Sequence, residues 1–184
     1  MHRIVPALLS LALFAAAAPA VADQNDPRLN AVFARLQKPD NPLEAETLEG
    51  MIWGIWYASN DAEVNRLMDQ GERAMAAQDM RTAIGAFTKI IEIAPGFAEG
   101  WNRRATLRYM MGDYQGSMAD IDETLLREPR HFGALSGLGM IMEQITGTKA
   151  YDEIRTRFLQ PLKLTHVVPQ VARQIPGLVN GYAG

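Results

Sequence analysis

The sequence contains no cysteine, only three histidines, and aromatic residues at 8% of its positions. Without cysteine, the chain forms no disulfide, iron–sulfur cluster or cysteine-ligated zinc site, and it has neither a thiol nucleophile nor an N-terminal cysteine for lipid attachment. His2, His131 and His166 lie too far apart for the paired spacing of a helical zinc site. We therefore expect no metal site and no cofactor.

Concentrated positive charge is also missing. The 18 Lys and Arg residues are outnumbered by 21 Asp and Glu residues, which gives a formal net charge of −3. Phosphate binding needs clustered basic residues, so we expect no nucleic-acid partner. No apolar run reaches the roughly 18–20 residues that span a bilayer. The 184 residues allow one domain or two small ones.

The first 22 residues have the three parts of a secretory signal peptide. Met1-His2-Arg3 is a short basic start, residues 4–18 are almost entirely apolar, and Ala20-Val21-Ala22 matches the small-x-small cleavage pattern. We expect cleavage after Ala22 and a periplasmic or secreted protein with no stable membrane insertion after cleavage. The alternative is an uncleaved membrane anchor, which the short, Ala-rich stretch disfavours.

A step of 34 residues organises the rest of the chain. Pro95 and Pro129 are 34 residues apart, and each follows apolar residues at helical spacing. The same step relates three large apolar residues, Leu67, Trp101 and Leu135. It also relates three small residues, Gly71, Ala105 and Gly139. Small residues at one position of every unit indicate that two helices approach closely there.

This pattern resembles the tetratricopeptide repeat, a 34-residue helix–turn–helix with the signature W-x2-L-G-x2-Y, then A-x3-F, then P. The matches are Leu67, Gly71, Ala83, Phe87 and Pro95 in residues 64–97, and Trp101, Ala105, Gly112-Asp113-Tyr114, Ser117, Ile121 and Pro129 in residues 98–131. Gln70, Arg104 and Arg108 depart from the signature. The resemblance implies an all-α solenoid of about seven or eight helices.

The repeat step and the proline positions divide the chain into six parts. After the signal peptide (1–22) we expect an N-terminal helical pair or degenerate repeat (23–63), two repeat units (64–97 and 98–131), an atypical repeat or capping helix pair (132–160), and a tail with several Pro and Gly residues (161–184). One repeat cannot bury its apolar face alone, so flanking helices are needed. We expect Trp53 to cover one end of the stack.

The first helix of each unit lines the concave side of such a solenoid. The residues expected there share a mixed character of carboxylates, amides, hydroxyls and flexible methionines: Met68, Glu72, Met75, Glu99, Asn102, Arg103, Thr106, Tyr109, Met140 and Glu143. Adaptable Met and amphipathic Tyr suit peptide or protein binding. The alternative is a plain solvated helix face with Met filling packing gaps.

Some tetratricopeptide repeat proteins clamp the C-terminal carboxylate of chaperones with basic residues at set groove positions. The matching positions are Met68, Glu72, Arg103, Gly133 and Gly137. Because only Arg103 is basic, we expect no such clamp.

A second group of residues is expected to be structural. Arg104 lies on a buried register and needs a partner, for which Asp120 on the following helix is favoured over Asp122. The alternative is an anion site formed by Arg103, Arg104 and Arg108. The structural group comprises Trp53, Gly71, Phe87, Pro95, Trp101, Arg104, Asp120, Pro129 and Gly139.

No motif indicates catalysis. His131 is expected to be a surface or capping residue, and Gly133, Gly137 and Gly139 lack the strand and the GK[ST] of a phosphate loop. The resemblance implies a non-catalytic scaffold that binds a protein or peptide in its concave groove, and residues 1–22 predict that this scaffold is exported. Alternatives are an assembly factor or chaperone-like helper of an envelope complex, and a small-molecule receptor or enzyme that uses the groove. Self-association through the exposed ends of the stack stays open.

Overall fold

The computed structural model describes residues 23–147, together with Thr156 and Gln160, and within them it contains seven helices and no strand. The helices are α1 (Arg28–Leu36), α2 (Pro42–Tyr57), α3 (Ala62–Ala76), α4 (Met80–Ile93), α5 (Ala98–Met110), α6 (Tyr114–Arg127) and α7 (Phe132–Thr146). The all-α repeat architecture expected from the sequence is confirmed. The signal peptide and the C-terminal tail lie outside the described residues, and the division into repeat units stays a prediction.

The turns between paired helices repeat at the same 34-residue step. Gln78 after α3 and Gly112 after α5 both adopt a left-handed conformation, with φ of 59° and 78°. Asp79 and Asp113 follow them and accept hydrogen bonds from Thr82 N and Gly116 N, which caps α4 and α6. Each turn therefore ends one helix and starts the next within three residues.

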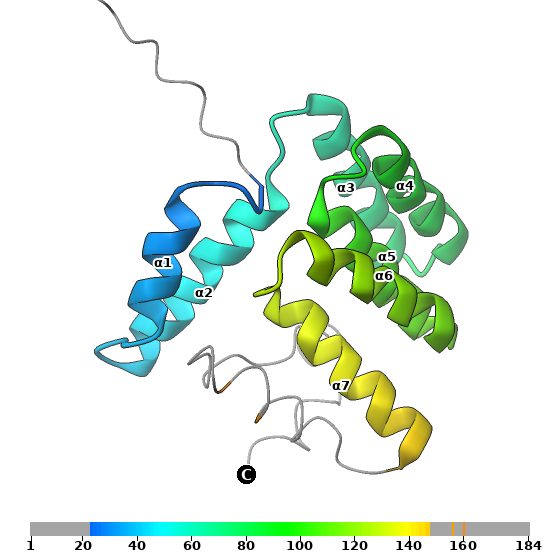
Figure 1. Cartoon of the computed structure of the whole chain (residues 1–184). Coiled ribbons are helices and arrows are strands. Elements are labelled where there is room, and N and C mark those ends of the chain that lie inside the picture. Colours follow the sequence, from blue (N-terminus) through cyan, green and yellow to red (C-terminus); the bar gives the residue numbers. More distant parts are fainter. Residues whose placement is uncertain (1–22, 148–155, 157–159, 161–184) are drawn as a thin grey trace, which may run out of the picture.

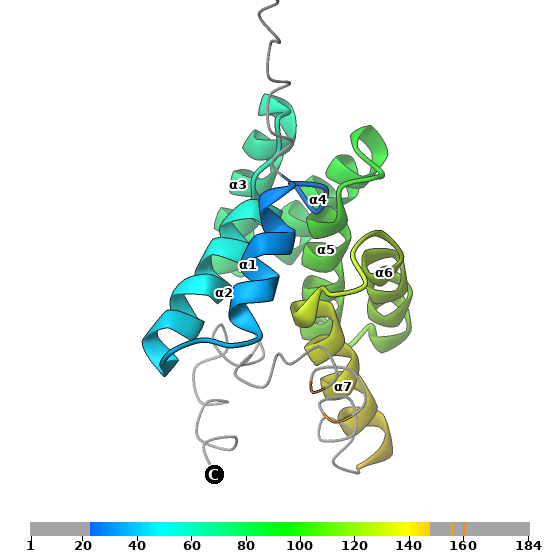
Figure 2. The same cartoon turned by 60° about the vertical axis from the view of Figure 1, so that its left-hand side comes forward.

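Two helix hairpins, α3–α4 and α5–α6, stack side by side, and α7 continues the series (Figures 1 and 2). Close approach within the first hairpin depends on Gly71, because a Cβ at this position would lie 2.4 Å from Cε1 of the Phe87 ring. In the second hairpin, the Ser117 hydroxyl donates to the Ala105 carbonyl at 2.8 Å. Gly139, at the equivalent position of α7, is buried.

The hairpin α1–α2 packs against α7 through its own apolar core. Trp56 and Phe132 are both about 1% exposed, and their rings are 4.9 Å apart. Trp53 is half-buried and contacts the Phe132 ring edge-on at 5.1 Å. A Cβ on Gly133 would lie 2.5 Å from Cη2 of Trp53. Trp53 thus packs where the start of α7 meets α2, beside the aromatic core of the hairpin.

The segment before α2 also reaches across the repeats. Gln24 donates from Nε2 to the Gly96 carbonyl at 2.6 Å and accepts from Ala98 N at 3.2 Å. Asn30 in α1 accepts a hydrogen bond from Arg130 at 3.0 Å, across 100 positions of sequence. These contacts join the beginning of the described chain to the start of α5 and to the turn before α7.

Trp101 occupies a different environment on the outer side of α5. The guanidinium groups of Arg104 and Arg127 both lie over its indole, at 5.2 Å and 4.7 Å from the ring centre. Trp101 Nε1 donates to the Pro95 carbonyl at 2.9 Å, and Arg127 Nε donates to the same oxygen at 2.5 Å. This cluster ties the turn before α5 to the end of α6.

Candidate functional site

The inner face is defined here as the surface that α3, α5 and α7 turn toward α2. The ten residues predicted for the concave groove differ in exposure. Six are buried, namely Met68, Met75, Glu99, Asn102, Arg103 and Met140, and four are half-buried, namely Glu72, Thr106, Tyr109 and Glu143. Their role in partner binding stays a prediction. An open, solvated groove through all ten residues is not what the structure contains.

The end of α2 covers the part of the inner face nearest to it. Tyr57 lies under Arg103 of α5, with the guanidinium carbon 4.2 Å from the ring centre. Trp56 stacks on His131, at 4.2 Å between ring centres and 15° between planes. The aromatic side chains of α2 therefore occupy the area where the sequence predicted solvent or a ligand.

Beneath these rings lies a buried polar cluster around Glu99, which is 1% exposed. One carboxylate oxygen of Glu99 accepts from Arg103 Nε at 2.6 Å, and the other lies 3.0 Å from Nε2 of His131. Asn102 Nδ2 contacts both oxygens at 3.2–3.3 Å. Glu99 therefore connects α5 to the start of α7.

Glu72 of α3 completes the cluster. Its Oε1 lies 3.3 Å from Arg103 Nε and accepts from the Tyr57 hydroxyl at 3.3 Å. Arg103 Nε is closer to Glu99 than to Glu72, so the one guanidinium group pairs more strongly with Glu99 than with Glu72. Burial and the neighbouring Glu99 carboxylate raise the pKa of Glu72 to about 7. Burial lowers the pKa of Arg103 to about 9, so this arginine remains a cation at neutral pH.

His131 is a capping residue, one of the two roles predicted for it. Its Nδ1 accepts the hydrogen bond of Ala134 N at 3.2 Å, which caps α7. However, His131 is fully buried and not on the surface, because Trp56 stacks on it and Glu99 bonds its other ring nitrogen. No pattern in the sequence relates His131 to Glu99 or to Trp56.

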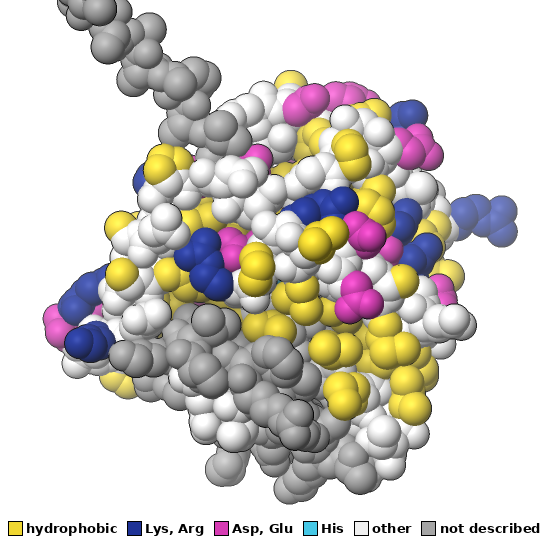
Figure 3. Space-filling view, in the orientation of Figure 1, with side chains coloured by type: hydrophobic (Ala, Val, Ile, Leu, Met, Phe, Trp, Pro, Cys, Tyr) yellow, Lys and Arg dark blue, Asp and Glu magenta, His cyan; other side chains and the backbone are white. Residues whose placement is uncertain are grey.

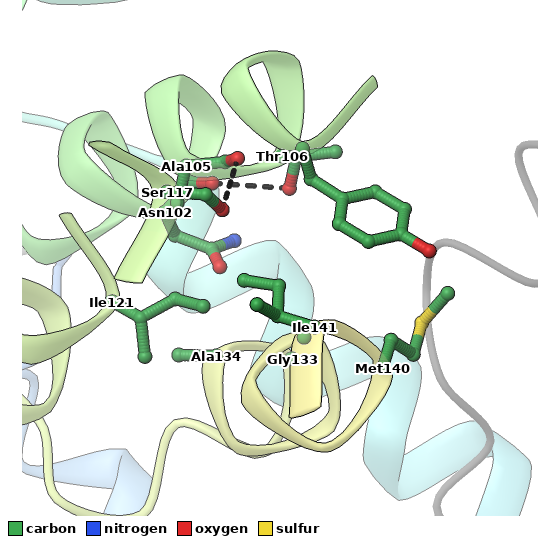
Figure 4. A pocket seen from close by; sticks show the side chains of 11 residues that line it. Asn102, Ala105, Thr106, Ser117, Ile121, Gly133, Ala134, Met140 and Ile141 are labelled. Atoms are coloured by element: carbon green, nitrogen blue, oxygen red, sulfur yellow. Dashed lines mark hydrogen bonds between the residues drawn. The ribbon is translucent and has the colours of Figure 1, made fainter. Parts of the chain in front are cut away.

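Beyond the area that α2 covers, a small cavity of about 20 Å³ lies between α5 and α7 (Figure 4). Four predicted groove residues line it: Asn102, Thr106, Tyr109 and Met140. Gly133, Ala134, Gly137 and Ile141 of α7, Ala105 of α5, and Ser117 and Ile121 of α6 form the rest of the wall. The volume matches about one water molecule or one methyl group.

Two hydroxyl groups of the cavity wall are engaged by backbone carbonyls. The Thr106 hydroxyl donates to the Asn102 carbonyl at 3.0 Å, and the Ser117 hydroxyl donates to Ala105, so neither proton is directed at a base (Figure 4). Among the described residues, no group of three His, Asp or Glu side chains is arranged to hold a metal ion. Burial and the nearby Tyr114 and Glu143 raise the pKa of Tyr109, which keeps its phenol protonated.

The surface around α7 is rich in apolar side chains. In the space-filling view, yellow side chains gather over the part of the molecule that α7 occupies in Figure 1, while basic and acidic side chains lie across the middle (Figure 3).

None of the helices in the described ranges is long and apolar enough to cross a membrane.

The predicted structural pair lies outside this site, on the α6 side of α5. Arg104 donates to both Asp120 oxygens at 2.9 Å and 2.8 Å, and Arg108 donates to one of them at 2.8 Å. The pairing of Arg104 with Asp120 is confirmed. Because Asp120 serves both arginines and Arg103 points to the opposite side, the three arginines do not form one anion site.

Comparisons with known proteins find relatives with repeats. A TPR repeat-containing protein of Rhizobium etli is 39% identical over 132 residues, which cover 72% of this chain and 65% of that protein. Tetratricopeptide repeat protein 36 of Mus musculus is 31% identical over 108 residues, or 54% of this chain and 57% of that protein. Small glutamine-rich tetratricopeptide repeat-containing protein 2 of Saccharomyces cerevisiae is 29% identical over 82 residues, or 45% of this chain and 24% of that protein.

The chain thus spans less than two thirds of the length of each of these relatives. No protein-family model matches the chain. The names of the relatives support the repeat family that the 34-residue pattern resembles, and the described helices have the arrangement of such repeats.

Proposed function

We propose that this chain is a tetratricopeptide repeat protein that binds a protein or peptide segment on the inner face, at the cavity between α5 and α7. The observation that carries the proposal is the cavity itself, because four of the ten residues predicted for binding line it from two successive inner helices. Stacked helix pairs present binding surfaces on this side. The chemistry of the cavity, with no nucleophile–base pair, favours a binding role over catalysis.

The size and polarity of the cavity indicate the kind of segment that fits. A space of about 20 Å³ admits one small apolar group and not a large ring. The flexible Met140 side chain and the amphipathic Tyr109 adapt to a peptide that runs along the cavity. A partner that inserts a small side chain here and contacts the apolar surface near α7 matches these properties.

Thr106 provides the test. Thr106→Arg places a long cationic side chain at the cavity wall, while Gly85→Arg places the same side chain on α4, where a Cβ meets nothing within 4 Å. Tagged wild-type and variant proteins are used to capture partners from the native host. We expect a partner that wild type and Gly85→Arg recover equally and that Thr106→Arg loses by at least about tenfold, or about 1.4 kcal/mol. Equal recovery by all three proteins would contradict the site.

We also propose that the protein is exported to the periplasm or secreted, on the basis of residues 1–22 alone. Their basic start, apolar stretch and Ala20-Val21-Ala22 are the sequence features of a cleaved signal. A partner in the cell envelope would then be accessible.

A further inference from the structure

The interface between α2 and the inner face combines aromatic stacking with buried polar groups that lack hydrogen-bond partners. Within the described part of the chain, Arg103 Nη1, Arg103 Nη2 and Trp56 Nε1 are buried without a hydrogen-bond partner. Buried donors without acceptors cost free energy, so an interface that contains three of them is poised to open at a lower cost than a fully paired one. All three donors lie where α2 meets α5 and α7.

The charges in this interface do not balance at every pH. With Glu72 protonated, the Glu99 carboxylate and the Arg103 guanidinium neutralise each other at 2.6 Å. With Glu72 ionised, two carboxylates share one cation, and the Tyr57 hydroxyl, which donates to Glu72 Oε1 at a long 3.3 Å, compensates the added negative charge only in part. The Glu72 side chain is only 31% exposed, so water compensates this charge incompletely.

We propose that Tyr57, Glu72, Glu99, Arg103 and His131 form a pH-sensitive latch, which holds α2 on the inner face in mild acid and loosens it as the pH rises to neutrality. The proposal concerns the position of α2 and does not depend on whether the cavity between α5 and α7 binds a peptide. Loosening α2 would uncover Arg103 and His131, and would extend the accessible inner face beyond that cavity.

The direction of the pH effect follows from the raised pKa of Glu72. The pKa of the Glu72 carboxyl is about 7 when α2 lies on the inner face, and near 4.5 when α2 is displaced and the carboxyl is exposed. Protonated Glu72 therefore stabilises the seated form of α2 fully below pH 4.5. That stabilisation declines as the pH rises and is lost above pH 7. With one proton involved, the ratio of seated to loosened α2 falls by at most about tenfold for each pH unit in this window.

Charged and titratable groups on every element around Glu72 are compatible with this behaviour. From α2 only Tyr57 faces it, since Glu49 lies about 12 Å farther along the helix. From α5 the facing groups are Glu99 and Arg103, and His131 precedes α7 on the far side of Glu99. The charged side chains of α4, which also packs on α3, are solvent-exposed: Arg81, Lys89 and Glu92.

Hydrogen exchange of the full chain tests the latch. The readout is the protection factor of the amides of residues 52–57, with α4 as the internal reference, at pH values between 5 and 7.5. For wild type we expect protection of α2 to fall with pH by up to about tenfold per unit, while α4 changes little. Glu72→Gln, which mimics the protonated carboxyl, should remove the pH dependence of α2, and Glu92→Gln, at an exposed position of α4, should retain it.

Two outcomes would overturn the latch: α2 protection that does not change with pH in wild type, or the same pH dependence in Glu72→Gln as in wild type. A second measurement keeps the test decisive if Glu72→Gln fails to fold. The carboxyl ¹³C resonance of Glu72 in the wild-type chain should titrate near pH 7, and a midpoint near 4.5 would overturn the proposal.

Discussion

Neighbouring arginines on α5 have opposite surroundings, and the difference determines what each one does. Arg103 is completely buried, and its two Nη atoms find no acceptor among the described residues. Arg104 bonds both oxygens of Asp120 and also Thr88, so its guanidinium holds α5 on the adjacent helices. A two-point arginine–carboxylate pair restricts both distance and orientation. Arg104 is therefore a structural residue, whereas Arg103 belongs to the contact with α2.

The pair of Arg104 and Asp120 gives a stability prediction. Asp120→Ala should lower the free energy of unfolding by about 2–4 kcal/mol, because it leaves Arg104 and Arg108 without their shared acceptor in a largely buried place. In a double-mutant cycle with Arg104→Ala, we expect a coupling of about 1–3 kcal/mol. Urea unfolding of the four proteins measures both values. Additive effects of the two substitutions would mean that the two side chains do not stabilise each other.

At the scale of helix pairs, one small residue sets the distance between α3 and α4. Gly71 faces the Phe87 ring, whose Cε1, Cζ and Cδ1 atoms lie within 3 Å of where a Cβ would be. Phe87 is fully buried, so other side chains surround the ring on its remaining sides. The glycine is thus required by close packing, although glycine inside a helix lowers its intrinsic stability.

Gly71→Ala and Gly85→Ala should have opposite effects. Gly71→Ala should destabilise the protein by about 1–2 kcal/mol, since overpacking outweighs the gain in helix propensity. Gly85 on α4 is exposed, and a Cβ added there would meet nothing within 4 Å. Gly85→Ala should therefore stabilise the protein by about 0.5–1 kcal/mol. Thermal unfolding of both variants checks the signs. If both alanines stabilise, the packing against Phe87 is looser than the structure indicates.

The sequence was most informative about features that repeat. Pro95 and Pro129 lie shortly after the ends of α4 and α6, and the aspartates that cap α4 and α6 are 34 residues apart. The docking of α2 has no such signal, because a repeat period reports contacts between successive units, and the contact of Trp56 with His131 joins residues 75 positions apart. Glu99, Asn102 and Arg103 therefore appeared to be groove residues, since three polar positions on one helix normally face solvent.

At the scale of the whole molecule, the proposed export predicts the covalent state of the mature protein. Intact mass measurement of protein from the native host should find a chain that begins at Asp23. Ala22→Arg, which removes the small residue before the cleavage site, should leave the longer chain. Recovery of the wild-type protein at full length, in any cellular fraction, would contradict cleavage after Ala22.

Bridging of the repeats by the segment before α2 has a consequence for how the protein folds. Repeats that contact only their neighbours fold from any point and unfold from their ends. Here Gln24 bonds residues 96 and 98, and Asn30 bonds Arg130 across 100 positions, so sequence-distant contacts close the array. Such contacts raise the contact order, which slows folding. They also couple the terminal helices to the middle ones, so we expect the units to melt together in a single transition.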